Sequence, residues 1–173
     1  MRQFQLKRLV AISAVGLALS APFAYGGGLG HAAPVMPAGE GLTLEYRDGN
    51  GATSRETIPI YHAGAVKYFS AGVGLEERSA HYPPVPLKLI FVAGPKAYLS
   101  QISVTITDAA GKVRLEVPQE RVTGPWLFVD LPQGAYDITA EGPGRTKVKE
   151  RVTITGKEHK TVYLRWKAET AQS

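Results

Sequence analysis

The sequence has no cysteine among its 173 residues and no long apolar segment. Without cysteine there can be no disulfide, no thiolate metal ligand, no cysteine nucleophile and no lipid attached through sulfur. The apolar stretch at residues 9–20 is shorter than the roughly 20 residues that span a bilayer. We therefore expect no stable membrane span in the mature protein.

The stretch at residues 9–20 has instead the pattern of a secretory signal peptide. Three basic residues precede it within the first eight positions, and small residues follow it as far as Ala24. We predict a signal peptide over residues 1–24, with cleavage after Ser20 as an alternative. The protein is then periplasmic or secreted, which argues against a nucleic-acid partner.

Charge is unevenly distributed along the chain. From Arg145 to the C-terminus there are eight basic and three acidic residues. Such a region can meet an anionic surface or polymer. The simpler interpretation, which we favour, is the solvated face of two strands.

Glycine and proline are abundant, with 19 and 12 residues, and this favours many short strands joined by turns. Residues 127–140 are the clearest case, with the sequence LFVDLPQGAYDITA. An apolar run is followed by a turn at 131–134, where Pro132 presets its φ and Gly134 tolerates positive φ. Strict alternation then predicts a strand with one buried face.

Runs of this kind recur at short spacing between residues 87 and 166, which is typical of an antiparallel β-sandwich. We predict about seven strands, at residues 87–92, 102–107, 113–117, 126–129, 136–140, 148–154 and 161–166.

The predicted sandwich domain covers residues 87–167, and a disordered tail follows at 168–173. Residues 25–41 are rich in Gly, Pro and Ala without periodicity, and predict a flexible leader. Residues 42–86 predict an N-terminal extension. It contains a hairpin, with strands at 42–46 and 57–61, and a short helix at 75–80. Pro59 restricts the second hairpin strand to a sheet edge.

Three segments carry a resemblance to a known family: VTITDAAGKV at 104–113, FVDLPQGAYDITA at 128–140 and VTITGKEHKTVYLRW at 152–166. Together and in this order they resemble the carboxypeptidase regulatory-like domains, which have a transthyretin-like (prealbumin) sandwich. The resemblance implies an all-β, Ig-like or transthyretin-like fold, and a binding or structural module rather than a catalyst.

Two earlier segments, at residues 67–78 and 87–106, are similar to a group of small exported bacterial proteins that carry such a domain and have no assigned activity. That group usually has Tyr-x-Ser-Gly-Gly-x-Gly, and here Ala71 replaces the first glycine of the pair. Transthyretin-like hydrolases end instead in Tyr-Arg-Gly-Ser. This chain has YLRW at residues 163–166, so their catalytic ending is not present.

Candidate metal ligands and nucleophiles are scattered. No H-x-H or H-x-x-x-H spacing occurs among the histidines, which are His31, His62, His81 and His159. No strained nucleophile turn surrounds the serines, which include Ser70, Ser79, Ser100 and Ser103. We predict no metal site, no cofactor and no catalytic residue. A site that joins His62, His81 and an acid is the alternative.

The loop from Ser70 to Gly74 could bind an anion through free backbone N–H groups if a helix begins after it. Glu76 and Glu77 would repel an external anion, so packing against the sandwich is the favoured role. These two carboxylates could also serve as an acid–base pair. As sequence neighbours they project in different directions, and we expect both on a solvated face.

The aromatic residues have structural interpretations. Tyr136, two residues after Gly134, fits a tyrosine corner, and Trp126 fits a core or sheet-end position. Four tyrosines in the N-terminal half could instead form a platform for sugars: Tyr46, Tyr61, Tyr68 and Tyr82. We favour packing for these as well.

The sequence therefore predicts a non-catalytic exported module that binds another protein or an envelope component through sheet edges or loops. One alternative is a carbohydrate-binding module, based on the tyrosines. Another is an enzyme with a site near residues 67–78, where Glu76 or Glu77 would share a pocket with His62 or His81.

Overall fold

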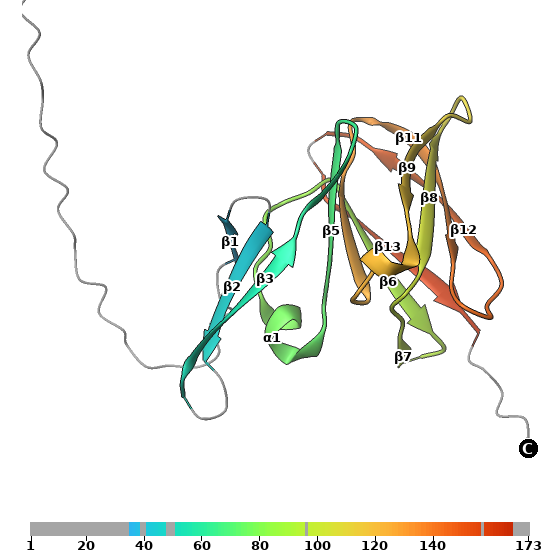
Figure 1. Cartoon of the computed structure of the whole chain (residues 1–173). Coiled ribbons are helices and arrows are strands. Elements are labelled where there is room, and N and C mark those ends of the chain that lie inside the picture. The colour runs from blue at the N-terminus through green and yellow to red at the C-terminus, as the bar shows by residue number, and fades with distance from the viewer. Residues whose placement is uncertain (1–34, 39–40, 48–50, 96, 157, 168–173) are drawn as a thin grey trace, which may run out of the picture. The chain divides into compact units, whose positions relative to one another are not determined.

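The computed structural model describes residues 35–38, 41–47, 51–95, 97–156 and 158–167, all within one compact unit of residues 31–173 (Figure 1). This part is mostly β-strand, with one short α-helix and one 3-10 turn, so the all-β class is confirmed. The predicted signal peptide, most of the leader and the C-terminal tail lie outside the described residues. No helix in the described ranges is long and apolar enough to cross a membrane.

One sheet has four antiparallel strands in the order β12-β11-β8-β9. The strands are β8 (Ser103–Asp108), β9 (Val113–Val117), β11 (Gly134–Glu141) and β12 (Val148–Ile154). The alternation seen in the sequence corresponds to burial, because Ile106 and Ile138 are inaccessible to solvent while Thr107 and Asp137 beside them are partly exposed.

A second sheet has the order β13-β6-β10-β5-β4, with β7 paired to β6. Its strands are β4 (Tyr61–Ala63), β5 (Val66–Ala71), β6 (Leu87–Ala93), β7 (Ala97–Tyr98), β10 (Trp126–Asp130) and β13 (Lys160–Trp166). β13 runs parallel to β6, and the other pairs are antiparallel. The seven strands predicted between residues 87 and 166 are all present.

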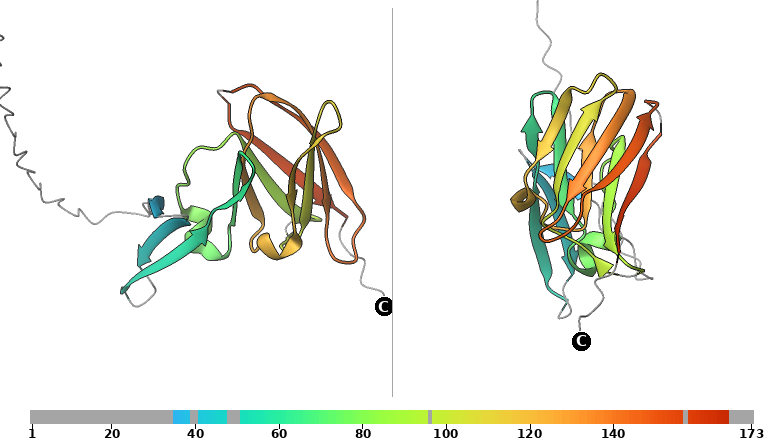
Figure 2. Two further views of the ribbon diagram at one scale, coloured as in Figure 1. Left: turned by 45° about the horizontal axis from the view of Figure 1, so that its top comes forward. Right: turned by 90° about the vertical axis from the view of Figure 1, so that its right-hand side faces the viewer.

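The two sheets face each other and enclose one apolar core (Figure 2). Leu89, Phe91 and Leu127 from the second sheet meet Ile106 and Ile138 from the first. Burying a side chain of this size contributes roughly 1.5–3 kcal/mol. The core therefore fixes which face of each strand points inward and which face is left for other contacts.

The turn between β10 and β11 is closed by a side chain. The Tyr136 hydroxyl donates a hydrogen bond to the Pro132 carbonyl at 3.0 Å, which confirms the predicted tyrosine corner. Gly134 is the first residue of β11 and has a positive φ of 157°, which other residues rarely adopt, so the predicted need for glycine is confirmed. A Cβ there would also lie 3.2 Å from the Tyr136 hydroxyl, so the space beside the ring favours glycine as well.

A third, smaller sheet has the order β1-β2-β3, from β1 (Val35–Ala38), β2 (Gly41–Arg47) and β3 (Thr53–Pro59). Leu42, Leu44 and Ile58 pack against Phe69 and Phe128 on the outer face of the second sheet. The predicted hairpin therefore covers an apolar patch on this outer face, outside the core between the two sheets.

Three predicted boundaries were wrong. The second sheet begins before residue 87, because β4 and β5 belong to it, and Ser70 and Ala71 end β5 rather than form a loop. Residues 35–38 of the predicted leader form β1. The second hairpin strand begins at Thr53 rather than at residue 57. Apolar alternation does not mark its start, because Ile58 is the only buried residue of this strand. Its edge position, inferred from Pro59, is confirmed.

Candidate binding groove

A groove of about 370 Å³ lies on the outer face of the second sheet. Its floor consists of Lys88 on β6 and of Trp126 and Phe128 on β10. These residues alternate with core residues such as Leu89 and Leu127, so they point away from the core. One wall is formed by Arg78 and residues 80–85, and the other by His159 and Thr161.

Hydrogen bonds hold both walls in place. The Tyr82 hydroxyl donates to the Glu77 carbonyl at 2.9 Å, which ties the segment 80–85 to α1 (Gly74–Ser79). A ring nitrogen of His159, Nδ1, lies 2.7 Å from the Val85 carbonyl oxygen. The Lys160 N–H donates to the Pro86 carbonyl at 2.9 Å. The groove is therefore preformed, and binding need not order its walls.

The aromatic residues in and beside the groove pack against one another. The rings of Phe69 and Phe128 stack with centroids 4.6 Å apart, and Tyr82 lies 4.9 Å from Phe128. The planes of Tyr82 and Trp126 are nearly perpendicular, at 83°. A sugar ring stacks on a flat exposed aromatic face. These rings do not present such a face jointly.

Lys88 is the distinctive residue of the floor. It is half-buried, and its Nζ lies 3.3 Å from the centroid of the Trp126 ring. Burial lowers the pKa of Lys88. Among the described residues it takes part in none of the ion pairs. The aromatic face partly compensates for lost hydration of the ammonium group.

The groove is basic overall. Arg78, Lys88, His81 and His159 line it, and none of its described lining residues is acidic. The indole Nε1 of Trp126 is buried and has no hydrogen-bond partner in the described part of the chain. A groove lined by cationic side chains, with no acidic residue among its described lining, favours a negatively charged ligand.

The predicted anion cradle at residues 70–74 exists, but the chain itself fills it. The Glu77 carboxylate accepts hydrogen bonds from the N–H groups of Gly72 at 2.6 Å and Val73 at 2.9 Å. Glu77 is only 5% exposed, so its predicted place on a solvated face was wrong. Glu76 is exposed, as predicted. Local sequence spacing carries no signal for a carboxylate that turns back to a preceding loop.

Burial raises the pKa of Glu77, and the neighbouring Glu56 on β3 raises it further. The two backbone N–H donors act in the opposite direction, because they stabilise the charged form. Burial also raises the pKa of Tyr82, with added repulsion from Glu77 and Glu56. Glu77 therefore joins the loop before α1, through its side chain, to Tyr82, through its backbone carbonyl.

The groove brings together two of the predicted candidate histidines. His81 and His159 both line it, whereas His62 lies exposed on β4 and His31 is outside the described residues. Within the described ranges, no three residues of a metal-binding type are grouped together. Glu76 and Glu77 do not line the groove, so it lacks the carboxylates that the enzyme alternative required.

Three of the four candidate serines bond to backbone groups. Ser70 is buried, and its hydroxyl accepts a hydrogen bond from the Gly124 N–H at 3.0 Å. The hydroxyls of Ser79 and Ser103 donate to the carbonyls of Glu76 and Glu141. These contacts give the three serines structural roles.

The four candidate tyrosines do not form one platform. Tyr61 and Tyr68 stack at 5.4 Å, and Arg121 lies over Tyr61 and donates to the Tyr68 hydroxyl at 2.9 Å. Tyr46 and Tyr82 belong to the separate cluster under the hairpin. Packing, the favoured interpretation of these residues, agrees with this division.

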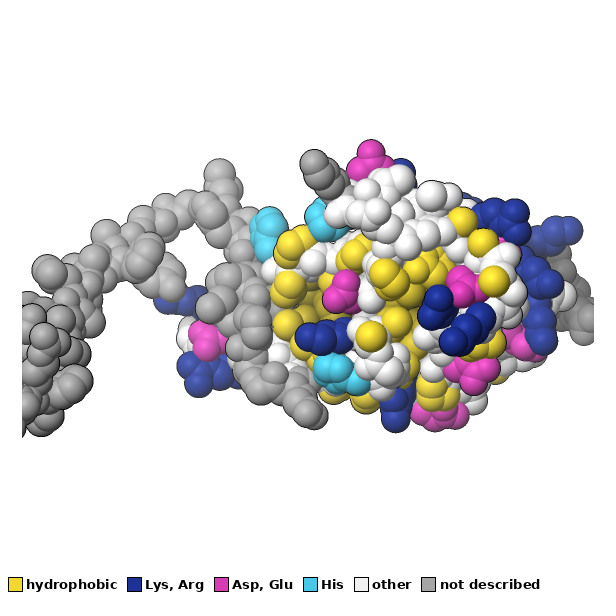
Figure 3. Space-filling view, turned by 90° about the horizontal axis from the view of Figure 1, so that it is seen from above, with side chains coloured by type: hydrophobic (Ala, Val, Ile, Leu, Met, Phe, Trp, Pro, Cys, Tyr) yellow, Lys and Arg dark blue, Asp and Glu magenta, His cyan; other side chains and the backbone are white. Residues whose placement is uncertain are grey.

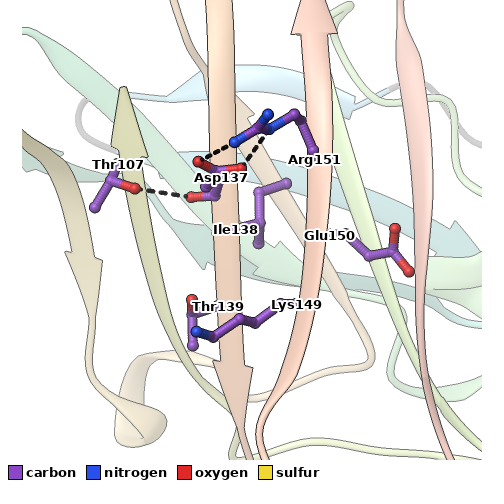
Figure 4. Close-up of a pocket in the computed structure, with 7 residues that line it drawn as sticks. All are labelled: Thr107, Asp137, Ile138, Thr139, Lys149, Glu150 and Arg151. Carbon is purple, nitrogen blue, oxygen red and sulfur yellow. Dashed lines mark hydrogen bonds and ion pairs between the residues drawn. The ribbon is translucent and has the colours of Figure 1, made fainter. Parts of the chain in front are cut away.

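A second depression, of about 560 Å³, lies on the outer face of the first sheet (Figure 4). There Arg151 makes two hydrogen bonds to the Asp137 carboxylate, at 2.6 and 2.9 Å. Lys149 and Glu150 add one charge of each sign. Because these charges compensate one another, this surface selects a ligand less strongly than the basic groove does.

Hydrophobic side chains also gather in the middle of the surface seen from above, with charged groups of both signs around and between them (Figure 3). This mixed face gives no preference for a ligand of one charge.

No protein-family model matches the chain, and neither a curated protein nor a solved structure resembles it significantly. The function must therefore be inferred from the geometry of this chain.

Proposed function

We propose that this protein is an exported, non-catalytic binding module whose groove on the second sheet holds a protein or an envelope component. We further propose that it has the Ig-like, transthyretin-like sandwich of the carboxypeptidase regulatory-like domains. The motif order in the sequence and the two facing sheets support this assignment. The signal-peptide pattern at residues 1–24 supports a location in the periplasm or outside the cell.

The observation that carries the binding role is Lys88, a half-buried cation without an anionic partner in the described chain, on the floor of a preformed groove. The aromatic rings compensate only partly for the lost hydration of this charge, and an anionic partner would stabilise it further. The side chains of Ser70 and Glu77 both accept hydrogen bonds from backbone N–H groups, which supports a binding role over catalysis.

A pull-down from a periplasmic extract tests the groove. Thr161→Trp places a large side chain in the groove wall, and Thr153→Trp makes the same change at an exposed position on β12. We expect the mature protein and Thr153→Trp to capture the same partner, and Thr161→Trp to lose it. Equal capture by both variants, or no partner for the unmodified protein, would contradict the proposal.

Export is tested separately by mass spectrometry of the protein purified from its native host. We expect the mature chain to begin at Tyr25, or at Ala21 if cleavage follows Ser20. A chain that retains residues 1–20 would remove the basis for a periplasmic role.

A further inference from the structure

We propose that the ligand of the groove is an acidic peptide segment whose carboxylate pairs with Lys88. This inference rests on the proposed binding role and adds the chemical class of the partner. It follows from the charges that line the groove, from the surroundings of Lys88 and from the arrangement of the aromatic rings.

The charges favour an anion. Arg78 and Lys88 contribute positive charge to the lining of the groove. None of the described lining residues is acidic, so nothing in the groove opposes an incoming carboxylate. Complementary charge of this kind speeds association and suppresses partners of the wrong sign.

The surroundings of Lys88 make the pairing specific. Its ammonium group lies over the Trp126 ring, 3.3 Å from the centroid, and 5.1 Å from the centroid of the Phe128 ring. A carboxylate that reaches it meets a cation that is less hydrated and less screened than one on an open surface. A charge-assisted hydrogen bond is stronger in such a place than in water.

The aromatic arrangement favours a peptide over an acidic glycan. Lys88 lies over one face of Trp126, and Phe69 stacks on one face of Phe128, so the two rings do not form a joint open platform for a sugar. Pro83 and Tyr82 supply an apolar wall beside the cation. That combination suits an acidic side chain followed by an apolar or aromatic one.

A random copolymer of glutamate and tyrosine serves as the probe, with polygalacturonate as the acidic glycan and a lysine–tyrosine copolymer of opposite charge. Binding is measured by titration calorimetry and by fluorescence excited at wavelengths selective for tryptophan. Trp126 is one of two tryptophans, and the other, Trp166, is buried with its Nε1 bonded to the Thr146 carbonyl. A fluorescence change therefore reports mainly on the groove.

We expect the glutamate–tyrosine copolymer to bind and the lysine–tyrosine copolymer not to bind. Lys88→Gln should weaken binding about tenfold or more, since it removes one charge-assisted hydrogen bond. Lys88→Arg should retain binding because it keeps the charge. The control Lys67→Gln, an exposed lysine on β5 of the same sheet, should change binding less than about twofold.

Equal binding by Lys88→Gln and the unmodified protein, or tighter binding of polygalacturonate than of the copolymer, would overturn the acidic-peptide assignment. Urea unfolding of each variant checks that the fold is intact. If Thr161→Trp abolishes partner capture while the copolymer fails to bind, the groove is the binding site but its ligand belongs to another class. If Thr161→Trp has no effect on capture, the binding role itself fails.

Discussion

Removing the Glu77 carboxylate leaves two partly buried backbone N–H groups, of Gly72 and Val73, without an acceptor. Glu77→Ala should therefore lower the free energy of unfolding by about 1–3 kcal/mol, the usual cost of an unsatisfied buried donor. Glu76→Ala, one position earlier on the same helix, removes an exposed side chain and should change it by less than about 0.5 kcal/mol. Urea denaturation of the two variants distinguishes them, and equal effects would contradict the structural role of Glu77.

The Tyr136 hydroxyl provides a second test at the scale of one residue. Tyr136→Phe keeps the buried ring and removes only the hydrogen bond to the Pro132 carbonyl. We expect a loss of about 0.5–1.5 kcal/mol in the free energy of unfolding. Tyr163→Phe is the matched control, because that side chain is 47% exposed. A thermal transition of Tyr136→Phe that coincides with that of the unmodified protein would show that the turn does not need this bond.

The hairpin of β2 and β3 is the element whose role differs most from the sequence prediction. It was expected as part of an extension outside the sandwich domain, yet Leu44 is fully buried against the second sheet. Leu44→Ala should lower the free energy of unfolding by about 2–5 kcal/mol. Leu75→Ala, at a position 76% exposed, should have little effect. A single unfolding transition, shifted in Leu44→Ala, would show that hairpin and sheets unfold together. A separate early transition would mean that they are independent.

Elements whose strands bury one face were predictable, because burial imposes alternation on the sequence. β8, β11 and β13 follow this rule closely. β3 has only one buried residue, so the alternation was absent over most of its length. β5 is buried on both faces at Tyr68 and Phe69, and its membership of the second sheet depends on pairing with β10, which is more than fifty residues away.

The candidate groove could be predicted only in part. The sequence marked His81 and His159 as candidate residues, but it gave no sign that they would line the same groove. Lys88 lies inside an apolar strand, and its unusual surroundings depend on Trp126 from another strand. The order of the strands in the sheet creates such a site. The pattern of neighbouring residues along the chain does not encode that order.

At the scale of the whole molecule, stability responds to pH through groups with shifts of opposite sign. The pKa values of Asp108, Asp137 and Glu158 are lowered in the fold, chiefly by hydrogen bonds to Lys112 N–H, Arg151 and Lys160 respectively. Each contributes stability above its ordinary pKa that is lost as the pH falls. The pKa of Glu77 is raised, chiefly by burial, so its contribution has the opposite dependence. It is fully present below the ordinary value of 4.5 and is lost as the pH rises through the pKa in the folded protein.

Glu77→Gln and Asp137→Asn should therefore change the pH profile of stability in opposite directions. Glutamine keeps an oxygen acceptor for the Gly72 and Val73 N–H groups but does not titrate, so the advantage of the unmodified protein over Glu77→Gln should shrink as the pH rises from 4 to 7. Its advantage over Asp137→Asn should instead stay nearly level over this range and shrink as the pH falls below the ordinary value of 3.8, because the pair with Arg151 requires the charged carboxylate. Urea unfolding at several pH values measures both differences.

Glu56 and Tyr82 border the Glu77 carboxyl, and Glu56→Gln should reduce the effect by removing the neighbouring charge. Parallel profiles for the unmodified protein and Glu77→Gln would show that Glu77 has the same pKa in the folded and unfolded chain, and that its burial has no electrostatic consequence.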